Sequence, residues 1–186
     1  SSVIVKYILA KKLFRSGRYN DALDELRKIN SFNNPVTPFI LFLEGSTLSI
    51  LKKYDQSIRV FNDCVRVSEK EIKNQEVGYR KRQLKINRDN CIVGIARSEF
   101  AWRKFDSANL HYLDLEKQSE VWPEILFEEA WNSYYQKDYN RTLGKLVTYK
   151  APVLSFVFNP EIDVLRAVTY LKMCLWGDSR RVVEEF

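Results

Sequence analysis

The sequence contains little glycine, proline, cysteine or histidine. Its 186 residues include six Gly, five Pro, three Cys and one His. So few Gly and Pro exclude a collagen-like or low-complexity chain, and 45% hydrophobic residues are enough to build a packed core. No apolar run approaches the roughly 18 residues that a membrane-spanning helix needs. The length suits one ordinary domain or a short array of repeats.

Cysteine is scarce and widely spaced, at Cys64, Cys91 and Cys174. Because an odd number leaves at least one thiol unpaired, we expect buried free cysteines, no disulfide framework and a reducing compartment such as the cytoplasm. The sequence begins without Met and ends inside a predicted helix, which indicates a piece of a longer protein. Any targeting signals of that protein are expected to lie outside it.

Residues for catalysis are also scarce. The single histidine, His111, excludes a His-pair metal site, and the sequence has neither a Gly-rich phosphate loop nor a paired-Cys motif. The adjacent Glu128 and Glu129 point about 100° apart on a helix, so their carboxylates do not converge. We therefore expect no enzyme activity, no metal site and no cofactor.

An aromatic residue followed by Asn or Asp recurs along the chain. The pairs are Tyr19-Asn20, Tyr54-Asp55, Phe105-Asp106 and Tyr139-Asn140, separated by 35, 51 and 34 residues. Each pair follows one stretch of helical apolar periodicity and precedes another. Since Asn and Asp side chains accept hydrogen bonds from free N–H groups at a helix start, we predict that they cap the second helix of a hairpin.

Small residues recur twelve positions apart, one in each helix of a predicted hairpin. The pairs are Ala10 and Ala22, Gly45 and Ser57, Ala96 and Ala108, and Ala130 and Thr142. Short side chains let two helix axes approach closely. The pattern predicts an all-α fold, a helical-hairpin repeat solenoid of about four hairpins plus a truncated fifth.

The sequence resembles the tetratricopeptide repeat (TPR) family, whose units of about 34 residues are helix–turn–helix hairpins. The residues that carry the resemblance are Leu9, Ala10, Gly17, Tyr19, Ala22 and Leu26; Gly45, Leu48, Tyr54 and Phe61; Ile95, Ala96, Phe105, Ala108 and Tyr112; and Ala130, Tyr139 and Leu146. Ser57, Thr142 and Val182 stand where the family usually has Ala. The resemblance implies one array over residues 1–186, with units at about 3–34, 38–70, 89–120, 123–150 and 160–186.

The interval of 51 residues exceeds the repeat by about 17, and the surplus falls within residues 69–89. One interpretation is that two neighbouring helices are each longer than usual and project together as a charged hairpin bent at Gly78. A disordered loop is the other interpretation. The basic side chains of this window suit phosphates or an acidic protein surface, although a solvated helix face explains them too. They include Arg80, Lys81, Arg82, Lys85 and Arg88.

In TPR proteins the first helices of the units line a concave surface that binds an extended peptide or a helix of a partner. The resemblance implies a groove here, lined by Lys11, Phe39, Phe42, Arg97, Phe100, Phe127, Trp131 and Tyr134. These side chains are mainly aromatic, so the groove suits an apolar segment with acidic flanks rather than the family's clamp for a C-terminal carboxylate. The alternative is that the aromatic rings pack against one another and close the groove.

The leading hypothesis is therefore a non-catalytic scaffold or adaptor that binds a peptide or amphipathic helix of another protein. The alternative function is binding of nucleic acid or another anionic surface through the basic hairpin at residues 80–88. A truncated last hairpin leaves apolar surface uncovered, so we also expect self-association through it. An apolar run at residues 153–158 either packs over the fourth hairpin or binds a partner.

Overall fold

The computed structural model describes residues 2–29, 34–154 and 159–185. These residues form ten α-helices and one short 3-10 helix, with no strand among them, which confirms the all-α prediction. The chain divides into two compact units, residues 1–104 and 105–186. No helix within the described ranges is long and apolar enough to cross a bilayer.

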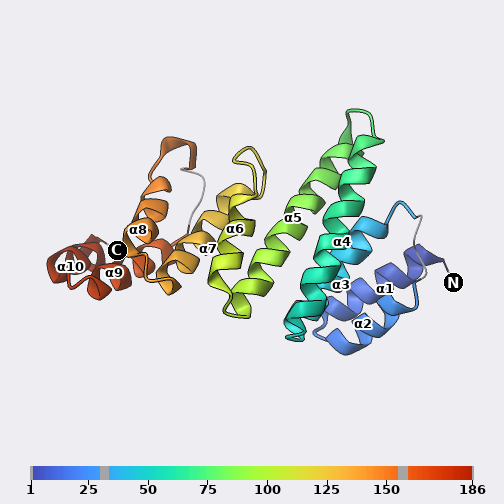
Figure 1. Cartoon of the computed structure of the whole chain (residues 1–186), viewed down its shortest axis with the longest axis horizontal. Helices are drawn as coiled ribbons and strands as arrows, with labels where there is room; N and C mark the ends of the chain where they lie inside the picture. Colours follow the sequence, from blue (N-terminus) through green and yellow to red (C-terminus); the bar gives the residue numbers. More distant parts are fainter. Residues whose placement is uncertain (1, 30–33, 155–158, 186) are drawn as a thin grey trace. The chain divides into compact units, whose positions relative to one another are not determined.

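Unit 1 contains five helices, coloured blue to green in Figure 1. They are α1 (Val3–Arg15), α2 (Tyr19–Arg27), α3 (Thr37–Ile50), α4 (Tyr54–Lys73) and α5 (Tyr79–Ala101). Consecutive helices pack against each other, and α3 also contacts both α1 and α5. This arrangement places the odd-numbered helices next to one another, as stacked helical hairpins require.

Unit 2 contains the remaining helices. They are α6 (Phe105–Leu113), α7 (Trp122–Tyr135), α8 (Tyr139–Thr148), the 3-10 helix η1 (Pro152–Leu154), α9 (Glu161–Lys172) and α10 (Trp176–Glu185). Consecutive α-helices again pack together, and α7 contacts α9. The fifth hairpin therefore has both of its helices. Most of the apolar run at 153–158 lies outside the described residues.

The first helix of every hairpin ends in the same turn. One residue adopts the left-handed conformation, with positive φ. The backbone N–H of the residue after it donates to the carbonyl five positions before that N–H, at 2.8–3.0 Å, which is a Schellman motif. The left-handed residues are Gly17, Lys52, Arg103, Lys137 and Cys174. Each lies two positions before the aromatic residue that begins the next helix. Within each unit, this turn sets the direction in which the second helix of a hairpin returns.

The predicted capping role of Asn and Asp is wrong. The second helices begin at the aromatic residue itself, so Asn20 and Asp55 lie inside α2 and α4, where no side chain caps the first turn. In α8 the cap is Asp138, whose carboxylate accepts from the backbone N–H of Arg141 at 3.1 Å. After the left-handed turn, each of these helices therefore begins two residues earlier than it would with the predicted Asn or Asp cap.

The small residues twelve positions apart are all buried, as close helix packing requires. The Ser57 hydroxyl donates to the carbonyl of Gly45 at 2.8 Å, which ties α4 to α3. The fifth hairpin repeats this contact, since Ser179 donates to the carbonyl of Ala167 at 3.1 Å. Ser179, rather than the predicted Val182, is therefore the small residue of α10.

The segment at residues 69–89 forms the ends of two long helices. Helix α4 continues to Lys73 and α5 begins at Tyr79, so only residues 74–78 connect them. The two helices pack along each other within unit 1 (Figure 1). Gly78 precedes the first turn of α5 with an extended backbone, φ 165°.

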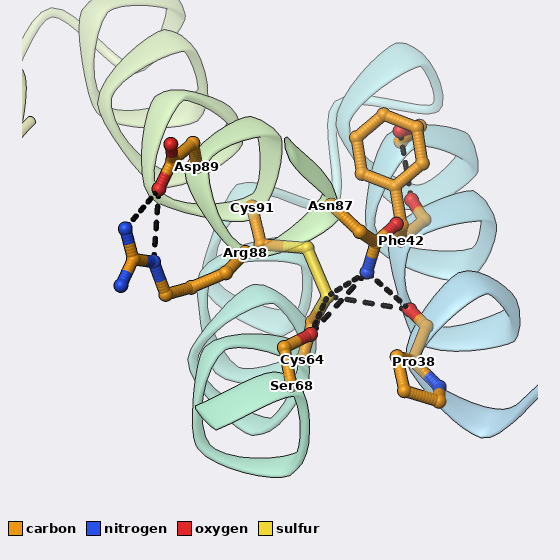
Figure 2. Close-up of a disulfide and its surroundings, with 9 residues drawn as sticks. Pro38, Phe42, Cys64, Ser68, Asn87, Arg88, Asp89 and Cys91 are labelled. Carbon is orange, nitrogen blue, oxygen red and sulfur yellow. Dashed lines mark hydrogen bonds and ion pairs between the residues drawn. A yellow bond between two sulfur atoms is a disulfide. The ribbon is translucent and has the colours of Figure 1, made fainter. Parts of the chain in front are cut away.

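The expectation of unpaired cysteines is wrong for two of the three. Cys64 of α4 and Cys91 of α5 form a disulfide, with Cα atoms 6.2 Å apart (Figure 2). The antiparallel helices bring together residues that are 27 positions apart in the sequence, and spacing alone does not reveal this. Cys174 is a free, exposed thiol. The expectation of a reducing compartment therefore loses its basis.

Candidate protein-binding groove

Unit 1 contains a cavity of about 340 Å³ bordered by α1, α3 and α5. Its lining residues are Tyr7, Lys11, Phe14, Arg15, Phe39, Phe42, Leu43, Gln83, Ile86, Asn87 and Asn90. The wall is thus aromatic on α1 and α3 and carries three side-chain amides on α5. We call it the α1–α3–α5 cavity.

Helical spacing explains why these side chains meet. Tyr7, Lys11 and Arg15 follow one another at intervals of four along α1, which places them on one face. On α5 the three amides at positions 83, 87 and 90 have intervals of four and three and share a face for the same reason. Pro38 lies in the first turn of α3, where its fixed φ favours the start of the helix. Phe39 and Phe42 follow in the first two turns of that helix, three positions apart.

The cavity favours negative charge. Lys11 and Arg15 line it, and no Asp or Glu is among its lining residues in the part of the chain that the structure describes. The Lys11 ammonium lies 6.0 Å from the centroid of the Tyr7 ring. Burial raises the pKa of Tyr7, and the Arg15 charge acts in the opposite direction, so the phenol remains a neutral hydrogen-bonding group.

The residues predicted to line a groove divide into three groups. Lys11, Phe39 and Phe42 line the α1–α3–α5 cavity. Arg97 and Phe100 lie farther along α5 and are not among its lining residues; Arg97 is exposed and Phe100 is half-buried. Phe127, Trp131 and Tyr134 belong to α7 in unit 2, where they pack against a core cluster of that unit.

The aromatic side chains of α7 pack against one another. Trp131 meets the rings of Phe127 and Tyr134 edge-on, at centroid distances of 6.3 and 5.6 Å. All three rings are half-buried and pack against a core cluster formed by Ala130, Leu146 and Leu165. In unit 2 these rings therefore form part of a packed cluster.

Several side chains of the basic segment bind other parts of unit 1. The Arg80 guanidinium donates to the carbonyl of Pro35 and lies 5.3 Å from the centroid of the Phe39 ring. Lys81 donates to the carbonyl of Gln75 at 3.0 Å, and Arg88 forms an ion pair with Asp89 at 2.6 Å. Arg82 and Lys85 are exposed. Arg80 thus adds positive charge beside the aromatic wall of the cavity.

Sequence reasoning missed the amide wall. Gln83, Asn87 and Asn90 fall in or next to the window that was interpreted as a projecting insertion, so no groove position was assigned to them. Their spacing of four and three residues is the signal from which a shared helix face could have been recognised.

A second cavity of unit 1, about 210 Å³, lies between α2, α3 and α4. Glu44, Asp63 and Arg66 contribute its charged side chains, and Asp63 pairs with Arg66 at 2.7 Å. Burial raises the pKa of Glu44, the Arg27 charge lowers it, and the Asp63 charge raises it. Because its charges are of both signs, this cavity shows no preference for an anionic ligand.

The last hairpin exposes several large apolar side chains. They are Val164, Leu171, Leu175, Trp176 and Val183. This is the region through which we predicted self-association, and the sedimentation mass of the chain at high concentration tests that prediction. A strict monomer would contradict it.

Comparisons with known proteins support the fold. No protein-family model matches the sequence, and no curated protein matches it. The crystal structure of the apo form of RapI, which has a TPR-like helical repeat fold, is similar with a TM-score of 0.77. The match covers 98% of this chain and 68% of that chain at 10% sequence identity. The chain therefore has a TPR-like helical repeat fold.

Proposed function

We propose that the chain is a TPR-family protein-interaction module, and that the α1–α3–α5 cavity binds an acidic segment of another protein with large apolar side chains. The observation that carries this proposal is the composition of the cavity wall, four aromatic rings beside Lys11 and Arg15. Membership of the family is proposed from the repeated small and aromatic residues together with the fold.

The size of the cavity favours anchoring side chains. At about 340 Å³ it lies at the lower end of the range of roughly 300–1,000 Å³ that is typical of ligand sites. Apolar anchors in desolvated pockets usually supply most of the binding energy at protein interfaces. We propose that one or two apolar side chains enter the cavity while acidic neighbours pair with Lys11 and Arg15.

We propose a role in binding alone, without catalysis or a cofactor. The cavity holds neither a histidine nor a cysteine, and no group of three His, Cys, Asp or Glu side chains suited to a metal ion occurs among the residues with described positions. Binding of nucleic acid through residues 80–88 is less well supported. Arg80, Lys81 and Arg88 already contact groups of the same unit.

A random peptide library displayed on phage tests the proposal. The chain selects binders, which are then tested against the double variant Lys11→Glu/Arg15→Glu. A matched control, Lys70→Glu/Lys73→Glu, changes the charge equally at two exposed positions of α4. We expect selected peptides to combine Asp or Glu with Phe, Leu or Ile, and to bind the first variant at least tenfold more weakly than the control. Equal binding to both variants would contradict the proposal.

A further inference from the structure

Asn87 connects the α1–α3–α5 cavity to the disulfide beneath it. Its side chain lines the cavity, and its Nδ2 lies 3.1 Å from the carbonyl oxygen of Pro38, 3.3 Å from Ser68 Oγ and 3.4 Å from Cys64 Sγ (Figure 2). A carbonyl oxygen only accepts hydrogen bonds, so the amide atom that faces Pro38 must be the nitrogen. The orientation of the amide is thereby fixed.

The opposite atom of the amide remains available to a ligand. Within the described ranges, no side chain or backbone group donates a hydrogen bond to Asn87 Oδ1. Asn87 therefore presents an acceptor in a cavity that Gln83 and Asn90 also line, together with the donors Lys11 and Arg15. A peptide segment offers both N–H donors and carboxylate acceptors, and this wall can bind both.

The disulfide determines which group bonds Pro38. Cys64 Sγ lies 3.3 Å from the Pro38 carbonyl oxygen, but a sulfur bonded to Cys91 has no hydrogen to donate. In the oxidised chain Asn87 is therefore the donor. A reduced Cys64 thiol has a hydrogen and competes for the same carbonyl, which would release the Asn87 amide from its fixed orientation.

The disulfide also fixes the position of α5. Cys91 lies one helical turn beyond Asn87, so the bond to Cys64 holds this part of α5 against α4. Both cysteines are fully buried. A reductant or oxidant therefore reaches the sulfurs only while α4 and α5 are apart, which is the case before they pack together during folding.

We propose that the Cys64–Cys91 disulfide, formed during folding, positions Asn87 and thereby completes the polar wall of the cavity. The two cysteine thiols react with a small disulfide oxidant such as oxidised glutathione. The S–S bond of the oxidant breaks and the protein S–S bond forms. The oxidant is released as two thiols, which take up the two protons that the cysteines lose. The effect of this disulfide on binding rests on the proposed function. It implies that the cavity binds its ligand only after an oxidant has formed the Cys64–Cys91 bond.

The first test needs no ligand. The side-chain NH₂ of Asn87, observed by ¹⁵N NMR, should exchange slowly with solvent in oxidised wild type. It should exchange at least tenfold faster in wild type refolded with a reductant, in which Cys64 is a thiol that can donate to Pro38. It should also exchange faster in Cys64→Ala/Cys91→Ala, in which no bond holds α5 against α4. Circular dichroism checks the helix content of both. Cys174→Ser is the control and should match wild type, because Cys174 is exposed in the other unit. Equal exchange in folded double variant and wild type would overturn the inference.

The second test measures binding of the probe acetyl-Asp-Phe-Glu-Leu-Asp-amide by calorimetry. We expect the double cysteine variant and Asn87→Leu, which keeps the disulfide, to bind at least tenfold more weakly than wild type. Wild-type affinity in Asn87→Leu would overturn the role of Asn87, even if the cysteine variant failed to fold. If wild type itself does not bind the probe while Asn87 exchange depends on the disulfide, the proposed ligand is wrong and the positioning role stands.

Discussion

Phe61 of α4 occupies the space that Gly94 of α5 leaves by lacking a side chain. A Cβ at Gly94 would lie 2.5 Å from Cζ of the Phe61 ring, and a Cβ at Gly45 would lie 2.8 Å from the same ring. Phe61 is buried and also contacts Phe42, whose ring centroid is 6.1 Å away. The ring therefore joins the packing of three helices to the wall of the cavity.

Gly94→Ala should consequently destabilise unit 1. The added methyl forces a buried ring to move, and overpacking of this kind costs about 2 kcal/mol in the free energy of unfolding. Gly144→Ala in α8 is the control, since a Cβ there meets no neighbouring atom within 4 Å. That substitution should stabilise its helix by about 1 kcal/mol. Chemical denaturation measures both, and a neutral Gly94→Ala would show that the helices are less closely packed.

The left-handed turns give a prediction of opposite sign. Lys137 has φ 64°, a conformation that costs a residue with a Cβ about 1 kcal/mol and costs glycine little. Lys137→Gly should therefore raise the stability of unit 2 by up to about 1 kcal/mol. Lys137→Ala removes the same side chain without relieving the backbone and should leave the thermal midpoint nearly unchanged. A lower midpoint for the glycine variant would contradict the turn geometry.

A buried ion pair in unit 2 should be sensitive to loss of one partner. Lys145 Nζ lies 2.7 Å from Glu129 Oε2, and the two side chains are only 16% and 6% exposed. Lys145→Met leaves the carboxylate buried without its cation and should cost about 3 kcal/mol in unfolding free energy. Lys145→Met/Glu129→Met should recover much of that loss. Arg59→Met, at an exposed pair with Asp55, should cost less than about 1 kcal/mol.

Glu44 should make unit 1 less stable as the pH rises. Burial, the largest effect, raises the pKa of this carboxyl above its ordinary value of 4.5, so the folded chain binds the proton more tightly than the unfolded chain. The resulting stability is present below pH 4.5 and is lost as the pH rises through the folded pKa. Glu44→Gln should therefore have a higher thermal midpoint than wild type at pH 7, with the difference shrinking at pH 4. Exposed Glu76→Gln should show neither effect.

The hairpin architecture was predictable because small residues at a constant spacing of twelve reflect close helix packing, and all of them are buried. The contact between Ser179 and Ala167 follows the same spacing. The turns were not predictable, since Lys52, Arg103 and Lys137 adopt the left-handed conformation without the glycine that usually marks it. The backbone hydrogen bond from the next N–H to the carbonyl five residues before it stabilises each of these turns.

The site was predictable only in part. Lys11, Phe39 and Phe42 followed from their positions on first helices, which the repeat determines. Asn87 and the Cys64–Cys91 bond depend on how two long helices align, and a sequence with an insertion between two repeats does not specify that alignment. Because the register was uncertain, Arg80 was predicted to belong to a projecting basic patch. Its guanidinium instead lies 5.3 Å from the centroid of the Phe39 ring.

An NMR titration of chain labelled with ¹³C-phenylalanine, using the peptide acetyl-Asp-Phe-Glu-Leu-Asp-amide, tests whether the α1–α3–α5 cavity binds an acidic segment with apolar side chains. We expect saturable shift changes at Phe14, Phe39 and Phe42, which line the cavity, and none at Phe127 in unit 2. Shift changes centred on Phe127, or no saturable change at the three cavity rings, would contradict the proposed binding.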